Sequence, residues 1–134
     1  MEKYFNSVSI VSGVVGGWVA WLLGGWDLLL WTLVGFIIFD YLTGLAKAWK
    51  TKTLSSEIGF EGLIKKMMII IMVVVANFLQ RLIGDAVPLR EIVILFFISN
   101  EGISLLENAA MFITIPDQLR DALLQLRNED KEGK

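Results

Sequence analysis

Long runs of apolar residues, separated by short polar segments, follow one another along most of the chain. The runs cover residues 8–23, 28–46, 67–83 and 92–113. A helix needs about 20 mostly apolar residues to cross the hydrocarbon core of a bilayer. Each run approaches that length once its flanks are included. We therefore predict an all-α integral membrane protein with about four transmembrane helices, all within residues 1–116.

The third and fourth runs each leave an alternative open. The third is rich in β-branched residues and would suit a buried strand in a soluble protein, but its neighbours also look like spans, so a helix is favoured. The fourth contains polar residues, and three spans followed by a helix lying on the membrane surface would place the C-terminal basic residues outside the cell. We favour four spans.

The residues after the fourth run predict a different kind of helix. Pro116 ends the run, and Asp117 can cap a last helix that reaches about residue 127. Apolar residues fall on one side of this helix, namely Leu119, Ala122, Leu123 and Leu126. Residues 117–134 are therefore predicted to form an amphipathic cytoplasmic helix and a charged tail.

Composition supports a membrane protein and argues against an enzyme. Of the 134 residues, 55% are hydrophobic, and there is no Cys and no His. The mean hydropathy is +0.64. Without Cys or His, disulfides, thiolate metal sites and the commonest general base are all missing. The remaining candidates, Asp40, Glu101 and Glu107, have no recognised catalytic spacing. We expect no catalytic residues, no cofactor and no metal.

Basic residues are distributed unevenly about the predicted spans. Ten of the 12 Lys and Arg lie in the N-terminus, the 47–66 segment and the C-terminal region, and only Arg81 and Arg90 lie on the other side. Loops rich in Lys and Arg stay in the cytoplasm. The distribution predicts a multi-pass protein of the bacterial cytoplasmic membrane with both termini in the cytoplasm.

The 47–66 segment contributes five of these basic residues, Lys47, Lys50, Lys52, Lys65 and Lys66. Ser55 or Ser56 can cap a short helix here, which suggests a segment lying on the membrane surface. A solvated basic loop is the alternative. Lysines spread over such a length beside spans usually report topology, so we expect no nucleic-acid partner.

Small residues recur at helical spacing along the first run. They form two neighbouring rows, one of Ser9, Gly13 and Gly17 and the other of Gly16, Ala20 and Gly24. Such rows let helix backbones approach closely in lipid. Glycine is also frequent in membrane helices for other reasons. We interpret the rows as a packing surface, and a homo-oligomer is expected.

Two polar residues interrupt the second and third runs. Asp40 lies near the end of the second and shares a face with Gly44 and Lys47, and Asn77 lies inside the third. A carboxyl at this depth either forms hydrogen bonds between packed helices or serves a function. The neighbouring Tyr41 and Thr43 favour a packing role for Asp40.

The fourth run carries a polar stripe. On a helix, Asn100, Ser104, Glu107 and Asn108 follow one face, and Glu101 lies at its edge. Each charge exposed to lipid costs roughly 2.5 to 3.5 kcal/mol. The stripe must therefore face another helix, another copy of the chain, or water. Either the carboxyls are neutral or hydrogen-bonded to Asn100, Asn108, Asn77 or Gln80, or they are ionised and wet.

Several segments together resemble the bacteriophage holins of the toxin-secretion and lysis group. The resemblance rests on the order and spacing of residues 40–44 (DYLTG), residues 54–56 with Gly59 and Gly62, residues 65–66, residues 100–108 (NEGISLLEN), and Pro116 with Leu119. It covers roughly residues 28–126. It implies a small phage or prophage protein that forms lesions in the host membrane, so that an endolysin or a large toxin crosses it and the host is lysed at a set time.

Two other classes stay open on the residues alone. A small channel or transporter would also use carboxylates inside the membrane, but the first and second halves of the chain show no convincing repeat. An assembly subunit of a larger membrane complex would explain the glycine rows equally well. The partners expected are the lipid bilayer, further copies of the chain, and an endolysin or secreted toxin.

Overall fold

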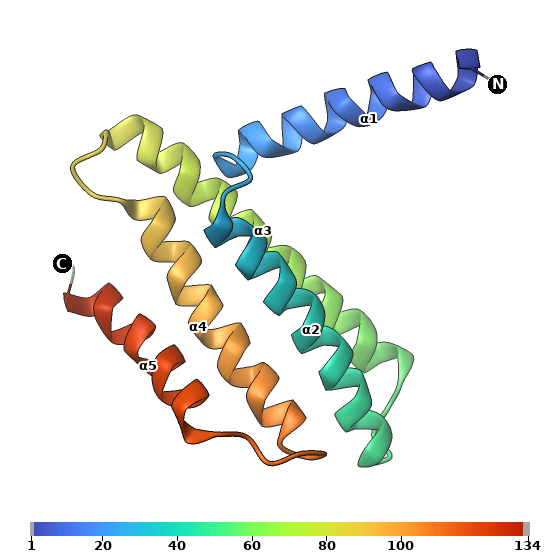
Figure 1. The fold of residues 1–134 in the computed structure, drawn as a ribbon, viewed down its shortest axis with the longest axis vertical. Coiled ribbons are helices and arrows are strands. Elements are labelled where there is room, and N and C mark those ends of the chain that lie inside the picture. Colours follow the sequence, from blue (N-terminus) through green and yellow to red (C-terminus); the bar gives the residue numbers. More distant parts are fainter. Residues whose placement is uncertain (1, 133–134) are drawn as a thin grey trace.

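A computed structural model describes residues 2–132, with side chains described as far as residue 126. This part of the chain contains five α-helices (Figure 1), and their bounds are α1 Glu2–Leu23, α2 Leu28–Lys50, α3 Ser56–Ile83, α4 Leu89–Ala109 and α5 Asp117–Glu132. The fold is all-α as predicted. The end of the predicted tail and the basic side chains of Arg127, Lys131 and Lys134 lie outside the described residues.

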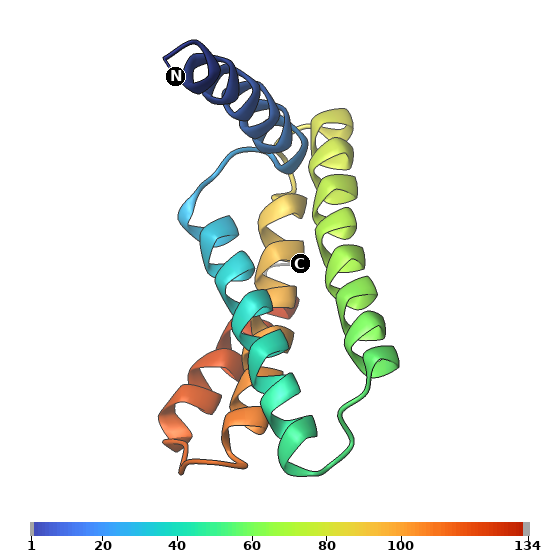
Figure 2. The ribbon, with the colours of Figure 1, turned by 90° about the vertical axis from the view of Figure 1, so that its right-hand side faces the viewer.

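Helices α2, α3 and α4 form an antiparallel bundle, and α5 runs back along α4 (Figure 1). Seen from the side, α4 lies between α2 and α3 (Figure 2). The most deeply buried apolar side chains of the bundle come from these three helices and are Leu30, Leu33, Val73, Ile94 and Ile98. The central position of α4 explains why a helix with several polar residues is also extensively buried.

Helix α1 leaves the bundle at one end (Figures 1 and 2). Among the described helices its backbone comes close only to that of α3, and Leu23 in its last turn is its one buried residue. Gly13, Gly16 and Gly17 have no atom of another element within 4 Å of where a Cβ would lie. These three glycines are thus free of contact with the other described helices.

Helix α3 begins earlier than the sequence pattern suggested. Ser55 caps it, accepting a hydrogen bond from the Ile58 amide (3.2 Å), and the helix then runs unbroken to Ile83. The short surface helix expected within residues 47–66 is therefore wrong. Gly59 and Gly62, in the first turns of α3, let the helix approach Tyr41 of α2.

Helix α4 ends earlier than the predicted 92–113 span. It stops at Ala109, and residues 110–112 form a turn. Lys50, in the last turn of α2, donates to the Met111 carbonyl and lies 5.0 Å from the centre of the Phe112 ring. This contact holds the α4–α5 connection against the end of α2.

Three described helices, α1, α2 and α3, are long and apolar enough to cross a membrane. Helix α4 spans 21 residues, about 31 Å at 1.5 Å per residue, and is packed between two of them. Its crossing of the bilayer stays a prediction.

Helix α5 packs through a face slightly different from the predicted one. Leu123, Leu124 and Leu126 are half-buried, whereas Leu119 and Ala122 are exposed. Leu123, common to both faces, fits against Gly102 of α4.

Candidate functional site

A cluster of ionisable side chains joins the three bundle helices near the middle of their length. Lys66 of α3 forms ion pairs with Asp40 of α2 and Glu101 of α4. The three side chains are 16%, 6% and 10% exposed, respectively. One ammonium group thus serves two carboxylates from different helices.

Asn108 completes this ion cluster. Its Nδ2 donates to Asp40 Oδ1 (3.0 Å), to the Asp40 carbonyl (3.3 Å) and to Thr43 Oγ1 (3.3 Å). A Cβ on Gly44 would lie 3.6 Å from the same nitrogen, so the small residue brings α2 close to α4 here. We use "ion cluster" below for Asp40, Lys66, Glu101 and Asn108.

Burial makes the ion cluster sensitive to loss of any member. Removing one partner of a buried ion pair typically costs 3–5 kcal/mol, roughly, because the other charge is left unpaired. Replacing a whole buried pair by apolar residues is often neutral. The ion pairs join α2, α3 and α4 at one level of the bundle.

A second polar group, the arginine anchor, lies at the end of the bundle where α1 enters. Arg90, at the start of α4, is 5% exposed. Its guanidinium donates to the Leu23 carbonyl (2.6 Å), Asp27 Oδ2 (2.7 Å) and the Gly25 carbonyl (3.0 Å). The hydrogen bond from Arg90 holds the pKa of Asp27 below its usual range. Asp27 also accepts from the Leu30 amide and so caps α2.

The last carbonyl groups of α1 receive further donors. Asn77 Nδ2 donates to the Leu22 carbonyl (2.9 Å), and Arg81 Nη2 donates to the Trp21 carbonyl (3.0 Å). Helix C-termini carry unpaired carbonyls and partial negative charge, which these donors satisfy. The C-terminal end of α1 is thus fixed firmly to α3 and α4, while the rest of α1 projects away.

Gly24 belongs to this junction and not to the packing row predicted on the first helix. Its φ is +83°, and a Cβ would lie 2.5 Å from Asn77 Oδ1 and 2.6 Å from Arg90 Nε. Gly24 is needed for the turn between α1 and α2, because other residues rarely adopt that conformation and would collide with the anchor.

The stripe predicted on α4 is divided between different surroundings. Glu101 and Asn108 are buried in the ion cluster, Asn100 and Ser104 are half-buried, and Glu107 is exposed. The partners proposed for the carboxyls, such as Asn77 and Gln80, bind elsewhere, and Lys66 takes their place. Glu101 therefore has its partner within one chain.

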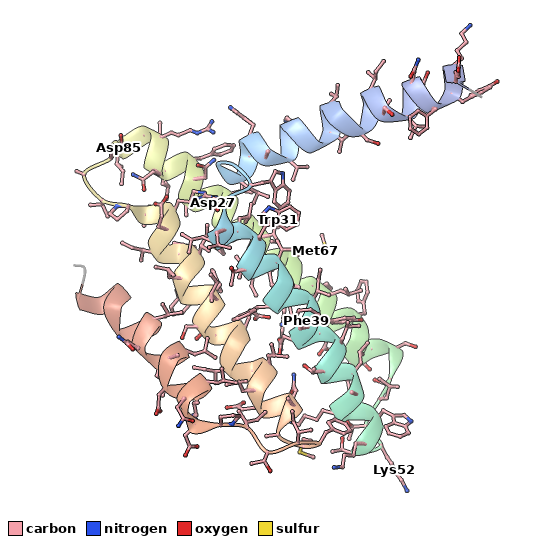
Figure 3. All side chains as sticks on the ribbon, in the orientation of Figure 1. Asp27, Trp31, Phe39, Lys52, Met67 and Asp85 are labelled. Atoms are coloured by element: carbon pink, nitrogen blue, oxygen red, sulfur yellow. The ribbon has the colours of Figure 1, made fainter. Side chains whose placement is uncertain are left out.

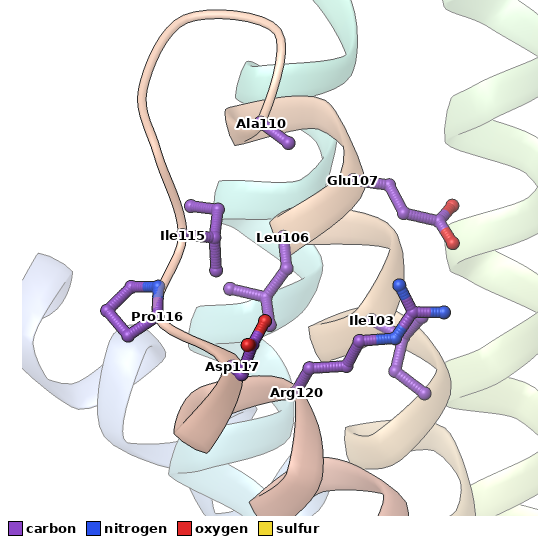
Figure 4. Close-up of a pocket in the computed structure, with 8 residues that line it drawn as sticks. All are labelled: Ile103, Leu106, Glu107, Ala110, Ile115, Pro116, Asp117 and Arg120. Atoms are coloured by element: carbon purple, nitrogen blue, oxygen red, sulfur yellow. The ribbon is translucent and has the colours of Figure 1, made fainter.

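Glu107 lines a small pocket of about 150 Å³ between α4, the connection that follows it and α5 (Figure 4). Ile103, Leu106, Ala110, Ile115 and Pro116 supply its apolar lining, and Asp117 and Arg120 line it as well. The site is too small for a large ligand.

Three of the five predicted topology lysines lie at the end of the bundle. Lys47 and Lys50 are in the last turn of α2, and Lys52 follows it with φ 58°. Lys65 lies further along, exposed on α3. Lys66 differs because it is turned inward. In the sequence, Asp40 and Glu101 are carboxyls within apolar runs and have no oppositely charged residue nearby, and Lys66 is a basic residue directly before an apolar run. That combination could have predicted the ion cluster.

These groups offer no catalytic arrangement. Lys66 is occupied by two carboxylates, and Arg90 is saturated by carbonyls and Asp27. Within the described residues, no three metal-ligating side chains gather in a way that would hold a metal ion. The clusters connect helices, which is the chemistry of a membrane bundle with a defined packing.

Comparison with known proteins gives the class to which this bundle belongs. A model of the bacteriophage holin family matches residues 17–128, a range that includes α2, α3, α4 and both polar clusters. The chain belongs to the bacteriophage holin family.

One of the similar proteins is itself named a probable holin. The chain is 33% identical over 133 residues to a probable holin of Bacillus phage phi105, covering 98% of this chain and 93% of the relative. It is 42% identical over 131 residues to an uncharacterized 14.9 kDa protein in the nagH 3′ region of Clostridium perfringens, covering 96% of this chain and 99% of the relative. It is 36% identical over 115 residues to the uncharacterized protein YqxH of Bacillus subtilis, covering 85% and 81%. No solved structure matches the chain.

Proposed function

We propose that this protein is a holin that accumulates in the bacterial cytoplasmic membrane, assembles with further copies and opens lesions large enough for an endolysin or a large toxin. The family match across the whole helical bundle is the observation that carries this proposal. The apolar outer surfaces of α2 and α3 support residence in a bilayer, because they expose large side chains such as Phe39 and Met67 (Figure 3).

The proposal places the N-terminus and the turn between α2 and α3 in the cytoplasm. The lysines at positions 47, 50 and 52, beside that turn, support this orientation. The arginine anchor would then lie at the outer surface of the membrane.

Assembly is proposed to use α1. Its C-terminal end is fixed by the arginine anchor, and Gly13, Gly16 and Gly17 meet no other described element, while Ser9 is exposed and Ala20 is half-buried. In lipid, close backbone packing at small residues is a main source of helix association. A helix of a neighbouring copy is the partner that we propose for these small residues.

Regulated expression tests the proposed function. The chain is produced from an inducible promoter in a bacterium that also holds a cytoplasmic endolysin lacking a secretion signal, and culture density and external endolysin are followed. We expect growth to continue and then stop abruptly, with release of the enzyme. Steady growth with the protein in the membrane and no enzyme outside would contradict the proposal and favour a transporter or scaffold.

Glu107 provides a sharper version of the test. This carboxylate is exposed on α4 near the end of the bundle, so its replacement by Leu should leave insertion intact. We expect Glu107→Leu to abolish lysis if the group faces the interior of the assembly, and Glu107→Gln to act as the size-matched control. Normal lysis timing with Glu107→Leu would remove Glu107 from the mechanism.

A further inference from the structure

The bundle has two chemically opposite sides. The outward side chains of α2 and α3 are large and apolar, and they include Phe39, Leu42, Phe60, Met67 and Met68. On the other side, five of the seven exposed positions of α5 as far as residue 126 are polar, namely Asp117, Gln118, Arg120, Asp121 and Gln125, and the other two are Leu119 and Ala122. Figure 1 shows α5 on the side of α4 away from α3. The bundle as a whole is therefore amphipathic.

Helix α5 fits closely into a notch on α4. A Cβ added to Gly102 would lie 2.7 Å from Leu123 Cδ2 and 3.0 Å from a ring carbon of Phe36 on α2, so only glycine admits Leu123 here. Beside it, Ser99 is fully buried and its Oγ donates to the Leu123 carbonyl (2.8 Å). These contacts fix the level of α5 along the bundle.

That level matters because Ser99 and Gly102 flank Glu101, a member of the ion cluster, on α4. Since the cluster lies near the middle of α2, α5 lies beside the middle of the helices that span the bilayer. Each charged side chain facing hydrocarbon at such a depth costs roughly 2.5 to 3.5 kcal/mol. The outer face of α5 must therefore meet water while α2 and α3 meet lipid.

We infer that the outer face of α5, and not the buried part of the predicted stripe on α4, borders the water-filled interior of an assembly of copies of this chain. The inference rests on the proposed function. The stripe on α4 is a poorer candidate because Glu101 and Asn108 are already bound within the chain. In the assembly, α4 forms the layer between the water-facing α5 and the lipid-facing α2 and α3.

A tether between α5 and α4 tests this inference. The natural chain has no Cys, so Ser99→Cys with Leu123→Cys adds one defined pair. The purified protein is reconstituted into vesicles of phosphatidylethanolamine and phosphatidylglycerol that hold a fluorescent protein of lysozyme size. After reconstitution, the pair is joined by oxidation or by a short bifunctional thiol reagent. Each single-Cys variant, treated in the same way, is the control.

We expect the joined protein to release the fluorescent protein as fully as the single-Cys controls, because α5 stays on α4 in the open assembly. Loss of release on joining, reversed by a reducing agent, would overturn the inference, since α5 would then have to leave α4. Failure of the pair to join in the membrane would overturn it too. If no variant releases the cargo, joined or not, the proposed function itself fails.

A second variant tests the water-facing surface directly. Gln118→Leu with Asp121→Leu makes the outer face of α5 apolar without touching the Leu123 contact. We expect loss of release with normal insertion and normal joining of the Cys pair. Unchanged release would mean that this face does not border water.

Discussion

Lys66 on α3 and Glu101 on α4 form an ion pair in the middle of the bundle, and protein covers most of both side chains. Because Asp40 on α2 shares the same ammonium group, one lysine determines how three helices align. The ion cluster thus joins α2, α3 and α4 at one level of the bundle.

Loss of the Lys66 charge should destabilise the bundle more than loss of a neighbouring charge. Lys66→Met leaves two carboxyls without their cation, and we expect a loss of about 3–5 kcal/mol in the free energy of unfolding. Lys65→Met is the matched control, since Lys65 is exposed, and should change it by less than about 0.5 kcal/mol. Denaturant titration in detergent measures both. Equal effects would show that Lys66 is not buried among carboxylates.

Glycine at position 102 should be required where glycine at position 35 is not. Gly102→Ala forces Leu123 and Phe36 to move, and we expect a loss of about 1–3 kcal/mol. A Cβ at Gly35 meets nothing within 4 Å. Gly35→Ala should leave the free energy of unfolding unchanged or raise it by up to about 1 kcal/mol, because alanine favours a helix. Thermal unfolding in detergent compares the two. A stable Gly102→Ala protein with α5 still protease-resistant would contradict the close contact.

The arginine anchor should control the attachment of α1. Arg90→Leu removes donors from the Leu23 and Gly25 carbonyls and from Asp27, so residues 20–27 should exchange their amide hydrogens faster. Arg90→Lys keeps the charge but not the planar set of donors, and an intermediate effect is expected. Hydrogen exchange in detergent or nanodiscs measures this. Unchanged protection in Arg90→Leu would show that the carbonyls have other partners.

Stability should fall in acid partly through Asp27. Its pKa is lowered in the folded protein, so the Arg90–Asp27 contact contributes stability above the unfolded pKa, about 3.9. That contribution is lost as the pH falls through the lower, folded pKa. Asp27→Asn keeps a helix-capping residue. Its free energy of unfolding should be lower than that of the natural protein, and this difference should shrink between pH 6 and about pH 3. A deficit that stays constant with pH would exclude this ion pair as its source.

The pattern of apolar runs was sufficient for the all-α fold, because helices that face lipid leave long uncharged segments. It was insufficient for the true start of α3. Gly59 and Gly62 are typical of loose segments, and only the Tyr41 ring on α2 explains why they belong to a continuous helix.

The ion cluster could be predicted only in part. Asp40, Glu101 and Asn108 were marked by their polarity among apolar neighbours, whereas Lys66 was counted with the cytoplasmic lysines. Its role depends on α2, α3 and α4 bringing three distant positions to one level, which local spacing does not report. Arg90 was missed for the same reason, since its partners lie more than 60 residues away.

A charge exchange in the ion cluster, read out as the time of lysis, tests the central claim most directly. Lys66→Glu and Glu101→Lys are made singly and together, and the double variant again has one cation and two carboxyls. We expect each single variant to lose timed lysis and endolysin release, and the double variant to recover them. Normal lysis in both single variants, or no recovery in the double variant although it reaches the membrane, would contradict the claim that this cluster holds the holin bundle together.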